Sequence, residues 1–182
     1  MKKIILTALC TLFTAVVYSQ TDSIGVYSVC NGSVQRVEIT KPVGTKMSSA
    51  VFSGKVKLQF DNATSETVFN DSAKFRVFYA VPSPYDAAKY FMFTPSYSIK
   101  DLSVAKFTVK KEMRYLTSST VSIIGSSTIG AKKAKDVNIV TKQIRPNVYE
   151  ITITGPAGEY CLLPLLNGIA TAHSGVFAFT IK

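Results

Sequence analysis

The chain contains 182 residues, of which 47% are hydrophobic and 18% are charged, and its formal net charge at pH 7 is +10. This composition excludes an intrinsically disordered chain, because it supplies enough apolar surface for a buried core. The length suits one domain. The basic excess predicts attraction to anionic partners, weakening as salt is added.

The first nineteen residues have the pattern of a secretory signal peptide. Lys2 and Lys3 give a positive start, residues 4–17 form an apolar run broken only by threonines, and the small Ser19 precedes the expected cleavage site. The run is shorter than the about 20 residues of a membrane-spanning helix, which disfavours an uncleaved anchor. We therefore expect residues 1–19 to be removed, leaving a secreted, periplasmic or outer-envelope protein without a transmembrane anchor.

The clearest local signal after the leader is a β-hairpin. Residues 24–30 and 33–39 are rich in Val and Ile, and Asn31 and Gly32 separate them. Both turn residues tolerate the positive φ that a tight type I′ turn requires. The sequence therefore predicts two antiparallel strands at the start of the mature chain.

The middle of the chain contains two further strand patterns. Residues 55–60 alternate between apolar and polar side chains, which predicts one face on the core and one in solvent. Residues 75–81 are apolar on both faces except for Arg76, which is typical of a central strand. Residues 41–50, with a proline, a glycine and a run of small side chains, are interpreted as a loop.

The remaining sequence continues as short β-prone segments between turns. We expect strands at residues 90–94, 104–110, 121–124, 137–144, 149–154, 159–163 and 176–181. No window has sustained helical periodicity. The sequence therefore predicts an all-β fold, a single antiparallel β-sandwich or barrel-like domain over residues 20–182.

Two cysteines, Cys30 and Cys161, remain after removal of the leader. An oxidising compartment permits a disulfide between them, which would close a long loop and contribute about 2–4 kcal/mol. The alternative is two free thiols, and both interpretations remain open at this stage.

Basic residues are concentrated in the second half of the mature chain. Residues 100–145 contain ten basic and three acidic residues, so they carry +7 of the +8 that remains after the leader. A surface of one sign attracts polyanions, although lysines also keep a surface soluble and protect strand edges. The candidate anion-binding residues are Lys106, Lys110, Lys111, Arg114, Lys132, Lys133 and Lys135.

Recognisable catalytic sets are missing from the sequence. His173 is the only histidine, so a histidine-rich zinc site cannot be assembled, and no phosphate-binding loop or nucleophile motif occurs. Glu159 could serve as one of a pair of catalytic carboxylates, but no second carboxylate stands out as its partner. We therefore expect no catalytic residues, no metal and no cofactor.

Several short motifs follow one another in a definite order. A Gly-x-Tyr hairpin at Gly25 is followed by residues 104–114, then by residues 147–151, by Gly-Glu-Tyr-Cys at residues 158–161 and by a final aromatic strand. This order resembles that of a group of small exported bacterial all-β proteins without a known activity. Each motif alone is unspecific, and their order carries the resemblance. Because that group has no named activity, the resemblance implies export and fold only.

These observations favour an exported, non-catalytic binding or interaction protein of the cell envelope or extracellular space. Its expected partner is an envelope polyanion or another envelope protein, and nucleic acid is not expected. Two alternatives remain: a secreted hydrolase acting through His173 or Glu159, and a structural subunit that pairs through strand edges.

Overall fold

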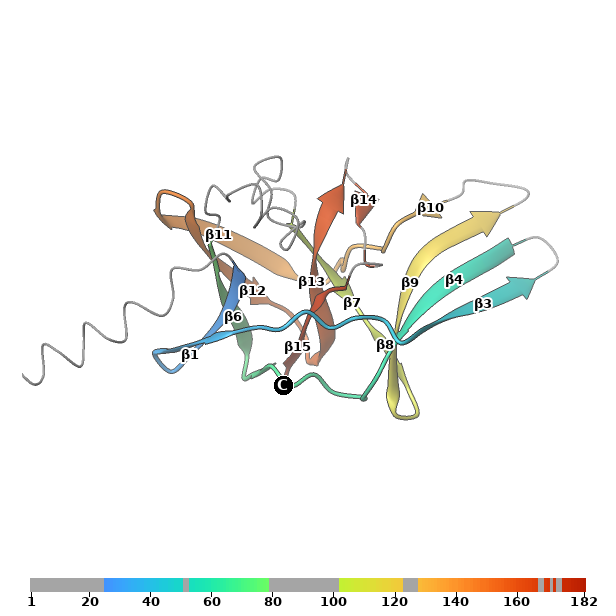
Figure 1. Cartoon of the computed structure of the whole chain (residues 1–182), viewed down its shortest axis with the longest axis horizontal. Helices are drawn as coiled ribbons and strands as arrows, with labels where there is room; N and C mark the ends of the chain where they lie inside the picture. Colours follow the sequence, from blue (N-terminus) through green and yellow to red (C-terminus); the bar gives the residue numbers. More distant parts are fainter. Residues whose placement is uncertain are drawn as a thin grey trace, which may run out of the picture.

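The computed structural model describes residues 25–50, 53–78, 102–122, 128–166, 169–170, 172 and 175–182, and within these residues every regular element is a β-strand. Three sheets follow one another along the long axis of the molecule (Figure 1). We call them sheets I, II and III. The predicted signal peptide, the expected strand at residues 90–94 and His173 lie outside the described residues.

Sheet I has the strand order β11-β12-β6-β1-β2, and all its pairings are antiparallel. Its strands are β1 (Gly25–Cys30), β2 (Ser33–Arg36), β6 (Ser72–Phe78), β11 (Asn138–Arg145) and β12 (Val148–Thr154). The turn between β1 and β2 has φ values of 48° at Asn31 and 79° at Gly32, which confirms the predicted hairpin. Strand β6 lies in the middle of the sheet, as predicted for residues 75–81, although in β6 the partly exposed Lys74 and Arg76 alternate with the buried Ala73, Phe75 and Val77.

Sheet II occupies the centre of the molecule. It contains β5 (Val68–Phe69), β7 (Leu102–Lys106), β13 (Gly158–Leu166), β14 (Ile169–Ala170) and β15 (Phe177–Ile181). Strand β13 pairs with β7, β14 and β15 in antiparallel fashion, whereas β15 pairs with β5 in parallel.

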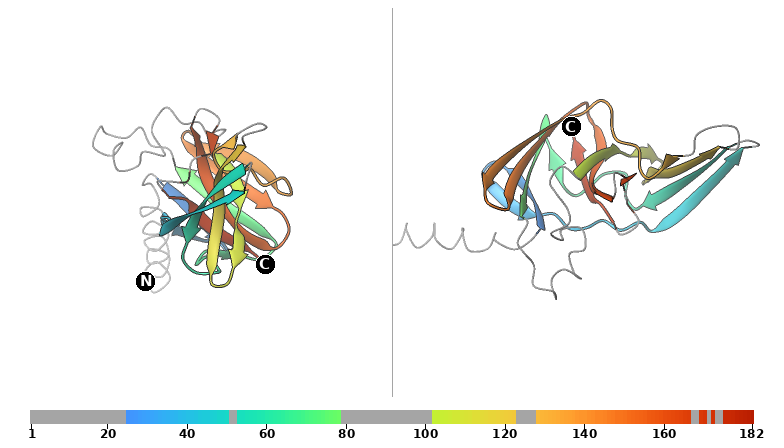
Figure 2. Two further views of the ribbon diagram at one scale, coloured as in Figure 1. Left: turned by 90° about the vertical axis from the view of Figure 1, so that its right-hand side faces the viewer. Right: turned by 90° about the horizontal axis from the view of Figure 1, so that it is seen from above.

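Sheet III projects from the other end of the molecule as a narrow arm (Figure 2). Its order is β10-β9-β4-β3, and β8 also pairs with β9. The strands are β3 (Gly44–Ala50), β4 (Ser53–Phe60), β8 (Thr108–Lys110), β9 (Met113–Ser122) and β10 (Thr128–Ile129).

Two expectations about this region were wrong. Residues 44–50 form β3 rather than a loop, because their backbone pairs along its whole length with the strongly alternating β4. The expected single strand at residues 104–110 is divided at Phe107, where the chain leaves sheet II as β7 and enters sheet III as β8.

Sheet II is covered on both faces because its side chains alternate between two apolar clusters. Tyr160, Leu162 and Phe179 pack with residues of sheet I such as Phe75 and Ile153. The intervening residues of sheet II face the other way and join the buried side chains of sheet III. This second cluster comprises Leu58, Phe60, Ala105, Phe107, Leu116, Ala131, Cys161, Leu163, Ala172, Val176 and Ala178.

The all-β prediction is therefore confirmed, and of the two expected architectures the described strands do not form a closed barrel. No described helix is long and apolar enough to cross a membrane.

Of the two open interpretations of the cysteines, the structure has the free thiols. Cys30 is an exposed free thiol at the end of β1 in sheet I, whereas Cys161 is a buried free thiol on the face of sheet II that packs against sheet III. The hairpin and the core thus place the two sulfur atoms in different layers.

Candidate anion-binding face

The outer face of sheet III carries a continuous set of lysines, and we call it the lysine face. On β4, the side chains of Leu58 and Phe60 point into the core. Lys55 and Lys57 lie at the alternate positions, so both point away from the core. Lys46 of β3 lies directly opposite Lys57 in the strand register. Tyr115 of β9 lies opposite Thr108 of β8 on the same face.

One hollow on this face has a volume of about 260 Å³, and we call it the tyrosine hollow. Lys46, Ser48, Lys57, Thr108, Lys110, Lys111 and Tyr115 line it. It thus combines four cations, two hydroxyl groups and one half-buried aromatic ring. No acidic residue lines it among the described residues.

A second hollow of about 580 Å³ lies beside it, and we call it the turn hollow because the basic turn after β10 forms one wall. Thr108 lines both hollows. The lining residues are Lys55, Lys106, Thr108, Leu116, Thr117, Thr120, Gly130, Lys132, Lys133, Ala134, Lys135 and Asp136. The turn is fixed against β7 by a bridge between Ala105 and Lys133 and by the hydrogen bond from Ala134 N to Val104 O (2.8 Å).

Asp136 is the one acidic residue among the described residues of the two hollows, and it is already paired. Lys106 Nζ lies 3.2 Å from its carboxylate and also sits over the ring of Tyr160. The hydrogen bond from Lys106 lowers the pKa of Asp136. The pKa of Lys106 is raised, chiefly by its contact with the Tyr160 hydroxyl and further by Asp136, although partial burial opposes this. The local anion is thus neutralised by Lys106.

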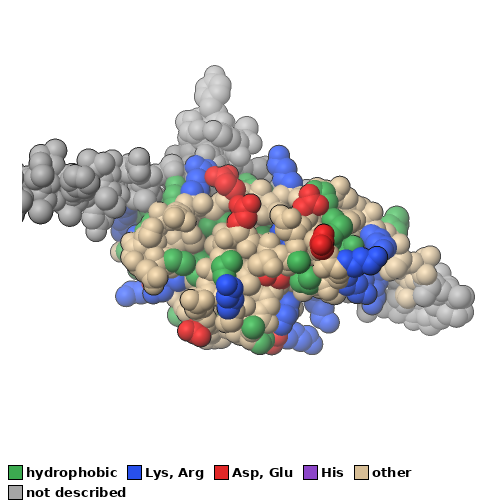
Figure 3. Space-filling model, turned by 90° about the horizontal axis from the view of Figure 1, so that it is seen from below, with side chains coloured by type: hydrophobic (Ala, Val, Ile, Leu, Met, Phe, Trp, Pro, Cys, Tyr) green, Lys and Arg blue, Asp and Glu red, His purple; other side chains and the backbone are tan. Residues whose placement is uncertain are grey.

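The other lysines of the two hollows form no ion pair with any described residue. Most are exposed, and Lys57 is half-buried. Because Lys46 and Lys57 are direct cross-strand neighbours, their charges repel each other. In the view from below, one group of basic side chains lies toward the end of the molecule that holds β3, β4 and β9, and others lie at the opposite end and along the lower edge (Figure 3). The lysine face is therefore a concentrated and uncompensated positive surface.

Six of the seven predicted anion-binding residues lie on this surface, and Arg114 does not. Lys106, Lys132, Lys133 and Lys135 line the turn hollow, while Lys110 and Lys111 line the tyrosine hollow. Arg114 has an inward position of β9 opposite Phe60, and its side chain is 4% exposed. The sequence predicted a strand only at residues 121–124, whereas β9 begins at Met113, so no predicted alternation placed Arg114 inside.

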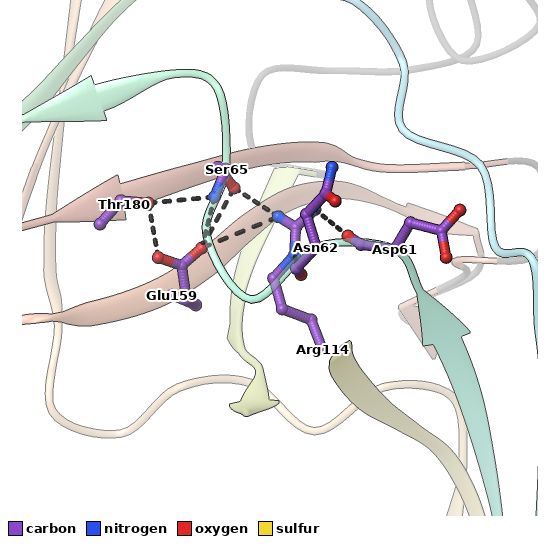
Figure 4. Close-up of polar contacts among 6 residues, drawn as sticks. All are labelled: Asp61, Asn62, Ser65, Arg114, Glu159 and Thr180. Atoms are coloured by element: carbon purple, nitrogen blue, oxygen red, sulfur yellow. Dashed lines mark hydrogen bonds and ion pairs between the residues drawn. The ribbon is translucent and has the colours of Figure 1, made fainter. Parts of the chain in front are cut away.

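Arg114 instead ties sheet III to sheet II through a buried polar cluster (Figure 4). Its Nε and Nη2 atoms donate to the carbonyl oxygens of Asn62 and Asp61, each at 2.9 Å, and its Nη1 donates to Ser65 Oγ. The same Nη1 lies 3.7 Å from Glu159 Oε2. Burial lowers the pKa of Arg114, and the charge of Glu159 opposes that effect. The guanidinium stays charged, because free arginine titrates far above pH 7.

The carboxylate of Glu159 accepts hydrogen bonds from the loop between β4 and β5 and from β15. Ser65 donates to Oε2 through its backbone N–H (3.0 Å) and its hydroxyl (3.2 Å), and the Thr180 hydroxyl donates to Oε1. Glu159 is 7% exposed. Its two oxygens are therefore committed to holding the loop between β4 and β5 against β13 and β15.

Lys46, Lys55, Lys57 and Tyr115 belong to the lysine face but were not predicted as binding residues. The alternation of residues 55–60 already placed the two lysines of β4 in solvent, and this was the available signal. The placement of the β4 lysines on the same face as Lys110 depends on the register of β4 with β9 and of β9 with β8. Strand β4 is far in the sequence from the other two strands. Among the described residues, no group of three or more His, Cys, Asp or Glu side chains could hold a metal ion.

Comparison of the chain with protein-family models, with curated proteins and with solved structures gave no match. The resemblance to a group of small exported bacterial proteins therefore stays a prediction.

Proposed function

We propose that this protein is an exported, non-catalytic binding protein of the cell envelope or extracellular space, and that the lysine face binds an anionic ligand. The single observation that carries the proposal is the tyrosine hollow, where four lysines converge and no acidic residue belongs to the described lining. An anion placed there would relieve the repulsion between Lys46 and Lys57.

The export part of the proposal is supported by the sequence of residues 1–19, with its positive start, apolar run and small residue before the cleavage site. In an envelope or extracellular setting, carboxylated, phosphorylated or sulfated polymers are the anions that such a surface would meet. Electrostatic attraction of this kind accelerates encounter and weakens with added salt.

The non-catalytic part is supported by the hydrogen bonds and the ion pair of Glu159. A general acid or base must be free to exchange a proton with a substrate. Glu159 instead accepts hydrogen bonds from Ser65 and Thr180 and faces Arg114 in the interior. This arrangement favours a structural role for Glu159 over a catalytic role for that carboxylate.

The test measures binding of fluorescein-labelled dextran sulfate to the purified protein by fluorescence anisotropy, with neutral dextran as the negative probe. We expect binding that weakens steadily as NaCl is raised from 50 to 500 mM. The variant Lys57→Gln/Lys110→Gln removes two charges from the tyrosine hollow and should bind about tenfold more weakly.

The matched control is Lys142→Gln/Lys182→Gln, which removes two exposed charges from β11 and from the C-terminal residue, away from both hollows. It should retain nearly the parent affinity. Equal losses in the two double variants would show that net charge, and not the lysine face, attracts the polymer. Absence of binding at 50 mM NaCl would refute anion binding itself.

A further inference from the structure

The two hollows lie next to each other along sheet III, and we call them together the track. Lys55 and Lys57 are separated by one residue on β4 and point to the same side, so their Cα atoms lie about 7 Å apart. Lys57 lines the tyrosine hollow and Lys55 lines the turn hollow. Thr108 belongs to both linings, so the two hollows adjoin at this residue.

The side chains of the track are complementary to an acidic sugar polymer. The cations of the two hollows are lysines without a described arginine, and they alternate with the hydroxyl groups of Ser48, Thr108, Thr117 and Thr120. Lysine is a compact point charge that pairs with single oxygens of carboxylate, sulfate or phosphate groups, whereas the planar arginine fork is suited to bidentate pairing. The hydroxyl groups offer both donors and acceptors, which match the hydroxyl groups of a sugar ring.

Tyr115 provides the apolar element that a sugar ring requires. It is half-buried on β9, lies opposite Thr108 and lines the tyrosine hollow beside Lys57 and Lys110. Single-stranded nucleic acid is bound by stacking successive bases on several aromatic side chains. The described lining of the two hollows offers one aromatic ring, so the track favours sugar units over bases.

We propose that the anionic ligand is a linear acidic polysaccharide, sulfated or uronate-bearing, whose chain crosses both hollows over Thr108 with a sugar ring against Tyr115. This inference rests on the proposed function and adds the class of ligand and its path. A chain of this kind brings its charges at regular intervals, and these meet the lysines of the two hollows in turn. Engaging both hollows at once should raise affinity beyond that of either hollow alone.

The experiment is a length series of heparin fragments, from disaccharide to about twenty sugar units, titrated against the purified protein by anisotropy or calorimetry. We expect affinity to rise steeply up to the length that spans both hollows and to increase little afterwards. Lys57→Gln/Lys110→Gln and Lys132→Gln/Lys135→Gln should each remove the length-dependent gain, at least about tenfold, while the disaccharide still binds to the unaltered hollow.

A second measurement separates a sugar polymer from any other polyanion. Tyr115→Ala should weaken binding of a long heparin fragment severalfold and leave binding of inorganic polyphosphate, which has no rings, nearly unchanged. Thermal unfolding of this variant establishes that it is folded at the assay temperature, and Tyr115→Phe, which keeps the ring, should restore the binding of the fragment.

The outcomes distinguish this inference from the proposed function. Binding that is equally tight for disaccharide and long fragments, or tighter binding of poly(dT) than of heparin, overturns the polysaccharide path and leaves anion binding intact. Equal effects of Tyr115→Ala on heparin and polyphosphate also overturn it. Failure of every anionic probe to bind refutes the proposed function together with this inference.

Discussion

Replacing Glu159 by glutamine should destabilise the fold more than any substitution of an exposed charge. The change preserves the shape of the side chain but removes its charge, which leaves the guanidinium of Arg114 buried without an anion. Removing one partner of a buried ion pair costs about 3–5 kcal/mol. Three neutral acceptors of Arg114, from Asp61, Asn62 and Ser65, remain in place, so the lower end of that range, about 3 kcal/mol, is expected.

The assay is urea unfolding of the purified protein, followed by circular dichroism. A loss of about 3 kcal/mol should lower the unfolding midpoint by roughly 1–2 M, because the dependence on urea for a protein of this size is on the order of 2 kcal/mol per molar. Glu150→Gln is the matched control, since Glu150 lies 3.8 Å from both Lys74 and Arg76 in a more exposed setting. The control should cost about 0–1 kcal/mol.

A double variant tests the physical cause. Arg114→Met/Glu159→Gln leaves no unpaired buried cation, so it should be less destabilised than the sum of the two single variants predicts. Strict additivity would show that the charges do not interact across the 3.7 Å between them. A loss for Glu159→Gln no larger than that for Glu150→Gln would refute the assignment of Glu159 as the tie between sheets II and III.

Three further outcomes follow from the same structure. A thiol reagent should label Cys30 in the native protein without prior reduction and should label Cys161 only after unfolding, because burial raises the pKa of Cys161 and shields its sulfur. Mass spectrometry counts the labels. A native protein with no reactive thiol would contradict the absence of a disulfide. Since Lys106 lowers the pKa of Asp136 below its ordinary value of 3.8, the stability from this pair should be complete above about pH 4 and disappear as the pH falls through the lowered pKa. The difference in urea midpoint between the parent and Asp136→Asn should accordingly vanish on acidification toward about pH 2, and a difference that persists there would count against the ion pair as its source. Lys57→Thr should raise the thermal midpoint slightly at low salt and not at 500 mM NaCl, because it removes a like-charge cross-strand pair; a stabilisation independent of salt would indicate strand propensity instead.

Local sequence patterns were sufficient to predict the elements whose structure depends on neighbouring residues. The Asn31-Gly32 turn requires positive φ at two consecutive positions, and few other residue pairs meet this requirement. Alternation in residues 55–60 placed Leu58 and Phe60 in the core, because a strand with one buried face repeats every two residues.

Features that depend on pairing between distant segments were missed. Strand β9 contains mainly small and hydroxylated residues, which carry little hydrophobic periodicity, and its identity as a strand comes from pairing with β4 and β8. The same gap hid the inward position of Arg114, which looked like one more member of a basic segment. The lysine face was therefore predictable in its charge but not in its shape.

The distribution of charge supports a binding role for the lysine face. In the interior, Arg114 and Glu159 satisfy each other and their neighbours, as buried charges must. Protection of strand edges can explain Lys46, because β3 is an edge strand, but it cannot explain the lysines of β4, which lies between β3 and β9. Lys57 faces a second lysine across the strand pair, an arrangement that costs stability. The fold itself gains nothing from placing that charge there, and an anionic ligand provides the compensating interaction.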